Sequence, residues 1–198
     1  MDLALDPLSL QGLADDTSTV VLDDFSDGTD IWNLHGLFGG GYWWIAAAGD
    51  LTQVFGVAGA WNSVTGDGQS HWISFRPDLS GISNAWANVG LDFGVAAGPL
   101  PELSRMQALR LVCRGTGSWT FTMVEQLAAS TRHWNAGISL DTGWTTVRIP
   151  ATSLADSGLV WSAGTHRVKQ IMFQTTGSGT LEIREVALEG VSLSNWSK

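Results

Sequence analysis

Short β-rich runs separated by turn residues recur along most of this chain, and they constrain its fold more than any other feature. Runs of β-branched and aromatic residues, bounded by Gly, Asp, Asn or Pro, recur from Thr19 to Leu188. Helical spacing of apolar residues extends over only about one turn, near 102–106. Roughly ten strands without a long helix predict an all-β fold, a two-sheet antiparallel β-sandwich of the jelly-roll type. The predicted strands lie at 19–22, 42–45, 72–75, 89–93, 108–114, 119–124, 134–140, 144–149, 170–175 and 180–188.

Compact turns separate several of these strands. Gly115-Thr116-Gly117-Ser118 lies between 108–114 and 119–124, and this pair is the clearest predicted hairpin. Asp141-Thr142-Gly143 and Gly177-Ser178-Gly179 also predict turns that join adjacent strands. Three pairs of consecutive strands are therefore expected to be neighbours.

Tryptophan is unusually frequent. The chain has 11 tryptophans but 1 tyrosine and 7 phenylalanines in 198 residues. Indole is large and its N–H needs a partner when buried, so a core of this size has room for only a few. Flat aromatic surfaces within reach of solvent usually mark a binding site, and tryptophan is well suited to stacking on sugar rings. An indole-rich core and a protein interface are the alternative explanations.

Alternation along the strands separates predicted core tryptophans from predicted surface ones. Trp119 shares a period-2 apolar face with Phe121 and Met123, which indicates the core. Trp43 and Trp44 are successive strand residues and so point to opposite faces, which leaves one of them available for binding. Core positions are also predicted for Trp134 and Trp144.

Charge excludes several classes of partner. The net charge is −9 and there are only two lysines, Lys169 and Lys198, whereas nucleic acids and anionic membranes bind clustered positive charge. No apolar run approaches the roughly 20 residues of a transmembrane span. The acidic residues 1–18 lack the basic start of a signal peptide. We expect 1–18 to be a linker or leader, 19–192 to form one domain and 193–198 to be a C-terminal tail.

Catalytic equipment is sparse. The sequence contains neither a G-x-S-x-G nor an H-E-x-x-H motif, its four histidines are scattered, and Cys113 is its only cysteine. Of the five glutamates, only Glu125 is predicted to lie near a cleft. A glycosidase would need a second carboxylate within about 9 Å of it. We therefore expect a non-catalytic protein that requires no cofactor.

The second half of the chain resembles family 11 carbohydrate-binding modules. An H-W strand, His133–Trp134, precedes a W-x-x-x-x-I-P strand, Trp144–Pro150, and then an I-x-F strand, Ile171–Phe173. The opening Val21–Phe25 and the aromatic run Tyr42–Trp44 also resemble the family's first strands. The similarity spans about residues 20 to 190. A related jelly-roll pattern occurs in the mitochondrial complex I assembly factor family.

The resemblance implies a galactose-binding-like jelly roll that binds β-glucan, cellulose or mixed-linkage, in a concave cleft without cutting it. It implies a secreted, monomeric module that directs an attached glycoside hydrolase to plant polysaccharide. The alternatives are a protein-interaction domain of the assembly-factor type and a small glycoside hydrolase that uses Glu125. The implied sugar-binding residues are Tyr42, Trp44, Trp86 and Trp161 for stacking, and Glu125, His133 and Gln174 for hydrogen bonds to hydroxyls.

The resemblance also bears on a structural calcium ion. Asp23 and Asp24 are the candidate ligands, since carboxylate oxygens suit calcium. Where the family has acidic calcium ligands, however, this chain has Ser26 and Arg184. Arg184 could pair with Asp23 or Asp24 by a bidentate contact and replace the ion.

Overall fold

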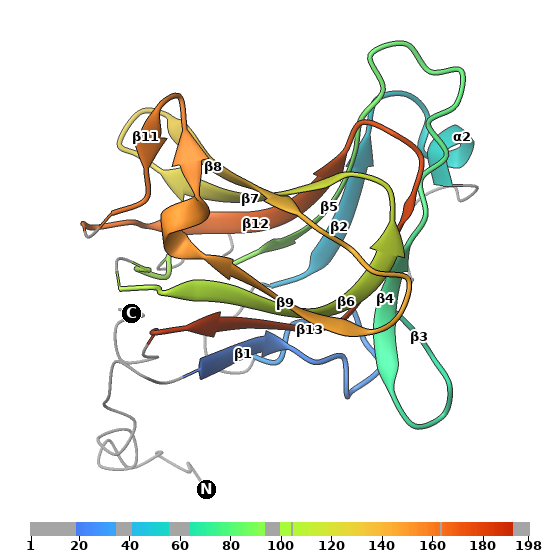
Figure 1. The fold of residues 1–198 in the computed structure, drawn as a ribbon, viewed down its shortest axis with the longest axis horizontal. Helices are drawn as coiled ribbons and strands as arrows, with labels where there is room; N and C mark the ends of the chain where they lie inside the picture. Colours follow the sequence, from blue (N-terminus) through green and yellow to red (C-terminus); the bar gives the residue numbers. More distant parts are fainter. Residues whose placement is uncertain are drawn as a thin grey trace, which may run out of the picture.

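Two antiparallel sheets pack face to face and account for most of the described chain (Figure 1). The computed structural model describes residues 19–34, 41–55, 64–93, 100–103, 105–162 and 164–191. The predicted leader, 1–18, and the predicted tail, 193–198, lie outside these ranges, as do Trp61 and Trp196. The predicted β-sandwich is confirmed. Within the described residues, no helix has the length and hydropathy needed to cross a membrane.

The six-stranded sheet has the order β3-β4-β13-β6-β9, and β1 also pairs with β13. The seven-stranded sheet has the order β11-β10-β8-β7-β12-β5-β2. The strands of the first sheet are β1 (Thr19–Asp23), β3 (Val64–Gly66), β4 (His71–Phe75), β6 (Ala108–Thr116), β9 (Thr145–Pro150) and β13 (Thr180–Glu189). Those of the second are β2 (Trp43–Ala47), β5 (Ala87–Asp92), β7 (Trp119–Gln126), β8 (Thr131–Ile138), β10 (Ala155–Asp156), β11 (Leu159–Val160) and β12 (Val168–Thr175). A short helix, α2 (Leu51–Phe55), follows β2, and a 3₁₀ turn (Ala151–Ser153) follows β9.

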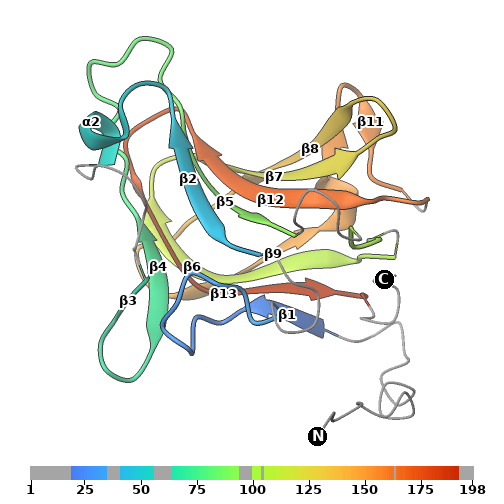
Figure 2. The ribbon, with the colours of Figure 1, turned by 180° about the vertical axis from the view of Figure 1, so that it is seen from behind.

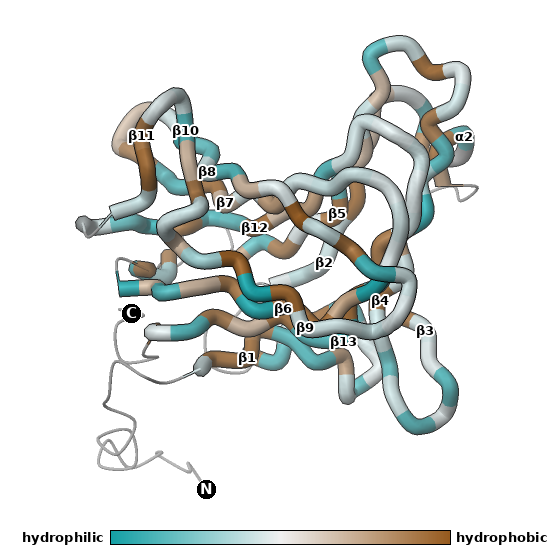
Figure 3. The backbone as a smooth tube through the Cα atoms, viewed as in Figure 1, coloured by the Kyte–Doolittle hydropathy of each residue, from teal (hydrophilic) through white to brown (hydrophobic). Residues whose placement is uncertain are grey.

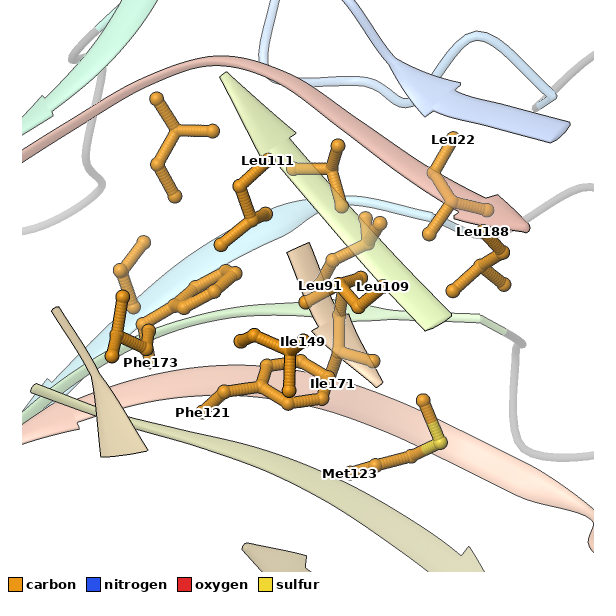
Figure 4. Packing of buried hydrophobic residues seen from close by; sticks show 14 of the residues in the cluster. Leu22, Leu91, Leu109, Leu111, Phe121, Met123, Ile149, Ile171, Phe173 and Leu188 are labelled. Atoms are coloured by element: carbon orange, nitrogen blue, oxygen red, sulfur yellow. The ribbon is translucent and has the colours of Figure 1, made fainter. Parts of the chain in front are cut away.

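The core lies between the sheets and is built from alternate residues of their strands. Figure 3 shows hydrophobic and hydrophilic residues alternating along strands of both sheets, as a half-buried sheet requires. Trp119 and Trp134, predicted for the core, are 3% and 2% exposed. The trapped side chains seen in Figure 4 include Leu91, Leu109, Leu111, Phe121, Met123, Ile171, Phe173 and Leu188.

The predicted hairpins are wrong, because each compact turn carries the chain from one sheet to the other. β6 pairs with β13 and β9, whereas β7 pairs with β12 and β8. The turns after β6 and after β12 pack backbone against backbone at one end of the sandwich. A Cβ on Gly179 would lie 2.5 Å from the Thr116 carbonyl oxygen, and Gly117 adopts a φ of 86°. Glycine is therefore needed where these crossings touch, and a glycine-rich turn does not imply a hairpin.

The seven-stranded sheet curves away from the six-stranded sheet, so its outer face is concave (Figures 1 and 2). The β10–β11 hairpin rises at one end of this trough, and β2 with α2 rises at the other. A bulge in β12 between Val168 and Gln170 interrupts its pairing with β7. Bulges bend the strand that carries them, so this one contributes to the curvature.

Candidate functional site

The concave face carries a continuous row of side chains that crosses the sheet. Strand pairing places Trp44 opposite Gly90, and Gly90 opposite Met172. Met172 lies opposite Thr122, which in turn lies opposite Asn135. Four strand spacings separate the two ends of this row, a distance of about 19 Å. The row is therefore long enough to hold an extended chain of several rings.

Polar residues flank this row on both sides. One neighbouring row consists of Ala46, Asn88, Gln174, Thr120 and Gly137, and the other includes Asp92, Gln170, Val124 and His133. Met172 is buried at the centre, with the Asn88 and Gln170 amide nitrogens 3.8 and 3.9 Å from its sulfur. The face thus has an apolar floor between amides, and an amide can both donate to and accept from a hydroxyl group.

Trp44 lies at the β2 end of the central row, anchored along one edge of its indole. Its Nε1 donates a hydrogen bond to Asp92 Oδ1 at 3.2 Å. The same edge lies over Gly90, where an added Cβ would be 2.4 Å from Cζ2 of the indole. Trp43 points the other way and is 3% exposed, which confirms that the two tryptophans face opposite sides. Trp44 remains half-exposed and is the available member of the pair.

Tyr42 and Trp86 lie on the same side of the sheet as Trp44. Tyr42 is two residues before Trp44 and is 50% exposed. Trp86 is half-exposed and precedes Ala87, which is fully buried and faces inward, so alternation turns Trp86 outward. The three aromatic residues therefore follow the β2–β5 side of the trough, where they can stack on a ligand.

Gln174 and His133 also belong to the concave face. Gln174 is half-buried and lies opposite Asn88 on β5 and Thr120 on β7. His133 is exposed on β8, and its Nε2 lies 3.4 Å from the Thr131 hydroxyl. The structure thus brings Tyr42, Trp44, Trp86, His133 and Gln174, all predicted from the resemblance, to one face.

Glu125 and Trp161 do not face this surface, which corrects their predicted placement. Glu125 is 3% exposed, because alternation along β7 turns it inward with Phe121 and Met123. Its Oε2 accepts a hydrogen bond from Trp134 Nε1 at 2.9 Å, and its Oε1 lies 3.0 Å from His166 Nδ1. Trp161 is 4% exposed and stacks on the His166 ring at 3.9 Å between centroids. Both residues therefore support the region below the β10–β11 hairpin rather than a ligand.

Asp23 and Asp24 are each engaged by hydrogen bonds from the protein. Asp23 Oδ1 accepts from the Phe25 amide at 2.8 Å, and Oδ2 accepts from Trp43 Nε1 at 2.7 Å. Asp24 Oδ1 accepts from the Ser26 amide and from the Asn33 side chain. Across the described residues, no group of three or more His, Cys, Asp or Glu side chains is arranged to hold a metal ion. Because both Asp23 oxygens face N–H donors, these residues as arranged do not fit a calcium ion.

Two further tryptophans lie on the outer face of the six-stranded sheet. Trp72 and Trp144 meet edge to face at 5.7 Å, and the Arg114 and Arg184 guanidinium groups lie 4.6 and 4.3 Å from the Trp144 ring centroid. Arg184 therefore stacks on indoles, and the expected pair with Asp23 or Asp24 is not formed. A core position for Trp144 is also wrong, since it is half-exposed among these arginines. Because cations cover their rings, Trp72 and Trp144 are poorly placed to stack on a sugar.

A buried carboxylate anchors the same cluster. Glu182 is 5% exposed and forms ion pairs with Arg76 and Arg114. Burial acts to raise the pKa of this carboxyl, but hydrogen bonds from the two arginines outweigh it and hold the pKa below its usual value. A hollow of about 360 Å³ nearby is lined by Asp24, Glu185 and Arg184 among others, and its lining includes no Trp, Tyr or Phe. The concave face, although it is an open strip, is the better candidate site.

Sequence reasoning missed several residues of the concave face. Met172 and Gln170 alternate with buried residues along the strand that holds Gln174, so period-2 counting from Gln174 would have found them. Asn88 and Asp92 would have followed in the same way from Trp86. Asn135 required the pairing of β7 with β8, which strand patterns alone do not specify.

Comparison with known proteins agrees with this architecture. No family model and no curated protein matches the chain. Among solved structures, a family 11 carbohydrate-binding module of the cellulosomal cellulase Lic26A-Cel5E of Clostridium thermocellum has a TM-score of 0.60 at 14% identity, over 88% of this chain and 96% of that chain. A Clostridium thermocellum family 11 module in complex with a β-1,3-1,4-mixed-linked tetrasaccharide has a TM-score of 0.58 at 15% identity, over 88% and 97%.

A third similar structure is a family 29 module variant complexed with mannohexaose. Its TM-score is 0.51 at 14% identity, over 92% of this chain and 98% of that chain. At these identities the likeness carries the fold and not the ligand. The jelly roll implied by the sequence resemblance is therefore confirmed: this chain has the fold of carbohydrate-binding modules of families 11 and 29.

Proposed function

We propose that the chain is a non-catalytic carbohydrate-binding module that binds β-linked glucan on the concave face of the seven-stranded sheet. The observation that carries the proposal is the placement of Trp44, half-exposed and anchored at the end of a strip of amides and hydroxyls about 19 Å long. An extended chain of several pyranose rings would fill that strip.

The chemistry of the strip suits a neutral sugar chain. Indole stacks on the apolar face of a pyranose ring, and the amides of Asn88, Gln170 and Gln174 can read its hydroxyls. The three rows of the face contain neither Lys nor Arg, and their one carboxylate, Asp92, is bonded to Trp44. A protein with a net charge of −9 and such a face would repel an anionic polymer.

Glucan is the favoured sugar because β-glucose carries its ring hydroxyls equatorially, so that both faces of each ring are apolar. The mixed-linkage tetrasaccharide bound by the similar family 11 module supports this choice. The mannohexaose bound by the family 29 variant makes mannan the competing ligand. In this proposal the module is secreted as a monomeric part of a larger glycoside hydrolase and holds that enzyme on plant polysaccharide.

A catalytic role for this face finds no support in its chemistry. Glu125, the glutamate predicted to lie near a cleft, is buried in contact with Trp134 and His166. Asp92 is the one carboxylate in the three rows, whereas glycoside hydrolysis uses a pair. We therefore propose binding without cleavage.

Affinity electrophoresis on mixed-linkage β-glucan, hydroxyethylcellulose, xylan and mannan would test the proposal. We expect retardation by the glucans that does not depend on salt, because the ligand is neutral. Trp44→Ala and Gln174→Ala should weaken binding, the first by about 10-fold or about 1.4 kcal/mol. Gln69→Ala, which removes an exposed amide from the turn between β3 and β4 of the other sheet, is the matched control and should bind like the wild type.

Three results would contradict the proposal. Migration of the wild type unaffected by every polysaccharide would exclude sugar binding and leave the protein-interaction alternative. Retardation by mannan alone would show that the sugar is wrong. Retardation by glucan that survives Trp44→Ala and Gln174→Ala would show that the binding face is wrong.

A further inference from the structure

Resting on that proposed function, we infer that Gly90 and Asp92 are positioning residues that hold the Trp44 indole in its sugar-binding orientation. Gly90 supplies a notch in β5 that receives the edge of the ring, and Asp92 supplies the hydrogen bond that fixes this edge. Neither residue needs to touch the ligand itself. Strand β5 thus supplies the two residues that position the ring, and β2 supplies the ring itself.

The absence of a side chain at Gly90 is required by the indole. An ideal Cβ would lie 2.4 Å from Cζ2 and 2.7 Å from Cε2 of Trp44, well inside van der Waals contact. It would also lie 2.9 Å from the Ile171 carbonyl oxygen on β12. Glycine inside a strand costs about 0.5–1 kcal/mol, and it commonly marks a place where another group approaches the backbone closely. At Gly90 that group is chiefly the indole.

Gly137 shows that a glycine on this face need not have such a role. It lies on β8, in the row next to that of Gly90, and a Cβ there would meet no atom within 4 Å. Alanine at Gly137 would therefore fill open space, whereas alanine at Gly90 would displace the indole. The two positions form a matched pair for the measurement without ligand. Gly143, where a Cβ would also meet no atom within 4 Å, lies in the turn between β8 and β9, off the concave face, and is the control for binding.

Asp92 fixes the direction of the ring. Its Oδ1 accepts the Nε1 proton at 3.2 Å, and Nε1 belongs to the edge of the indole that lies over Gly90. Burial raises the pKa of Asp92, while the hydrogen bond from Trp44 and the charge of Lys169 act in the other direction. The carboxylate is thus partly shielded from water, which strengthens a hydrogen bond to it. Asp92 and Gly90 both hold the Nε1 edge of the indole. The two faces of the ring are therefore the part that a sugar can contact.

Preorganisation of this kind raises affinity because the ring is already ordered before the ligand arrives. Immobilising one side chain on binding costs about 0.5–1.5 kcal/mol, which corresponds to about 2- to 12-fold in affinity. Displacing the indole would also remove its stacking contact. We therefore expect Gly90→Ala to weaken glucan binding about as much as Trp44→Ala, and Asp92→Ala to weaken it by a smaller factor.

The test measures binding to mixed-linkage glucan for Gly90→Ala, Gly143→Ala, Asp92→Ala, Trp44→Ala and the Gly90→Ala/Trp44→Ala double variant. We expect Gly143→Ala to bind like the wild type, and Gly90→Ala to add nothing once Trp44 is absent. Urea unfolding of each variant shows whether it is folded. If Gly90→Ala fails to fold because of its contact with Ile171, Asp92→Ala carries the test.

A readout without ligand separates this inference from the proposed function. The Nε1 proton of Trp44, identified by the signal lost in Trp44→Ala, should exchange faster with solvent in Gly90→Ala and in Asp92→Ala than in Gly137→Ala. Unchanged exchange would overturn the positioning role, and so would a Gly90→Ala effect on binding that persists without Trp44. If wild type binds no polysaccharide but the exchange rates behave as expected, the proposed function fails and the positioning role stands.

Discussion

Asp23 should make the stability of this protein fall as pH rises from about 4 to about 7, which is opposite to the behaviour of most carboxylates. Its side chain is fully buried, and both oxygens accept hydrogen bonds, from the Phe25 amide and Trp43 Nε1. Burial raises the pKa of Asp23 to about 7 from 3.8, although the two hydrogen bonds act to lower it. Desolvation of the charge therefore dominates the environment of this group.

The direction of the pH effect follows from proton binding. The folded protein keeps the Asp23 proton up to pH of about 7, whereas the unfolded chain releases it near 3.8. Between these values the folded state binds more protons, so the free energy of unfolding decreases as pH rises. A shift of about 3 pH units at about 1.4 kcal/mol per unit corresponds to about 4 kcal/mol.

Urea unfolding of wild type and Asp23→Asn from pH 5 to pH 8 would measure this effect. Asparagine stays neutral but can accept only one of the two N–H groups, so we expect it to be less stable by about 1–3 kcal/mol at pH 5. Between pH 5 and about 7 the wild type loses about 1.4 kcal/mol per pH unit and the variant does not, so the gap should close or reverse by about pH 7 and change little above it.

Both proteins contain the same other titrating groups, so the contribution of those groups to the pH dependence cancels in the difference between the two free energies of unfolding. The pKa values of Asp24, Asp67, Asp78 and Glu182 are lowered, so these carboxyls act below the window of the measurement. A gap that stays constant from pH 5 to pH 8, or that widens, would refute the account of Asp23 as a carboxyl dominated by desolvation.

Two matched pairs of substitutions test other assignments made from the structure, the first for ion pairs and the second for tryptophans. Arg114→Met should destabilise the protein by about 3 kcal/mol in urea unfolding, because it deprives buried Glu182 of a partner. Arg148→Met, which breaks the more exposed pair with Glu189, should cost less than about 1 kcal/mol; equal losses would contradict this ranking. Trp161→Ala should lower the free energy of unfolding by about 3–5 kcal/mol, because its indole is buried against His166. Trp86→Ala should leave thermal stability nearly unchanged and weaken glucan binding. Loss of stability in Trp86→Ala together with loss of binding alone in Trp161→Ala would show that the core and binding roles of these two residues are assigned the wrong way round.

Local alternation in the sequence predicted the sides of the strands correctly, but it could not predict which strands would be neighbours. The opposite orientations of Trp43 and Trp44 and the core position of Trp119 follow from period 2 alone. The partner of each strand does not, because a compact turn is equally able to form a hairpin and to cross between sheets. The contact between Gly117 and Gly179 that distinguishes the crossing joins turns that are far apart in the sequence.

Glu125 shows a second limit. Glu125 was predicted to lie near a cleft, and an isolated buried carboxylate would be costly. In the structure, the burial of Glu125 is offset by Trp134 Nε1 from β8 and by His166 from the segment before β12. Such compensation depends on three segments meeting, and no pattern within one segment reveals it. Trp161 was misplaced for the same reason, since its indole also packs edge to face against Trp134 from β8.

The tryptophan excess can now be divided by what covers each indole. Trp32, Trp43, Trp119, Trp134 and Trp161 are buried. Trp72 and Trp144 are half-exposed, but arginines lie over their rings. Within the described residues this leaves Trp44 and Trp86, and both lie on the concave face. An excess in composition therefore reduces to two available rings on one side of one sheet. Sugar binding is favoured by what lies beside these two rings, a strip rich in amides and hydroxyls that holds neither Lys nor Arg, more than by the number of tryptophans.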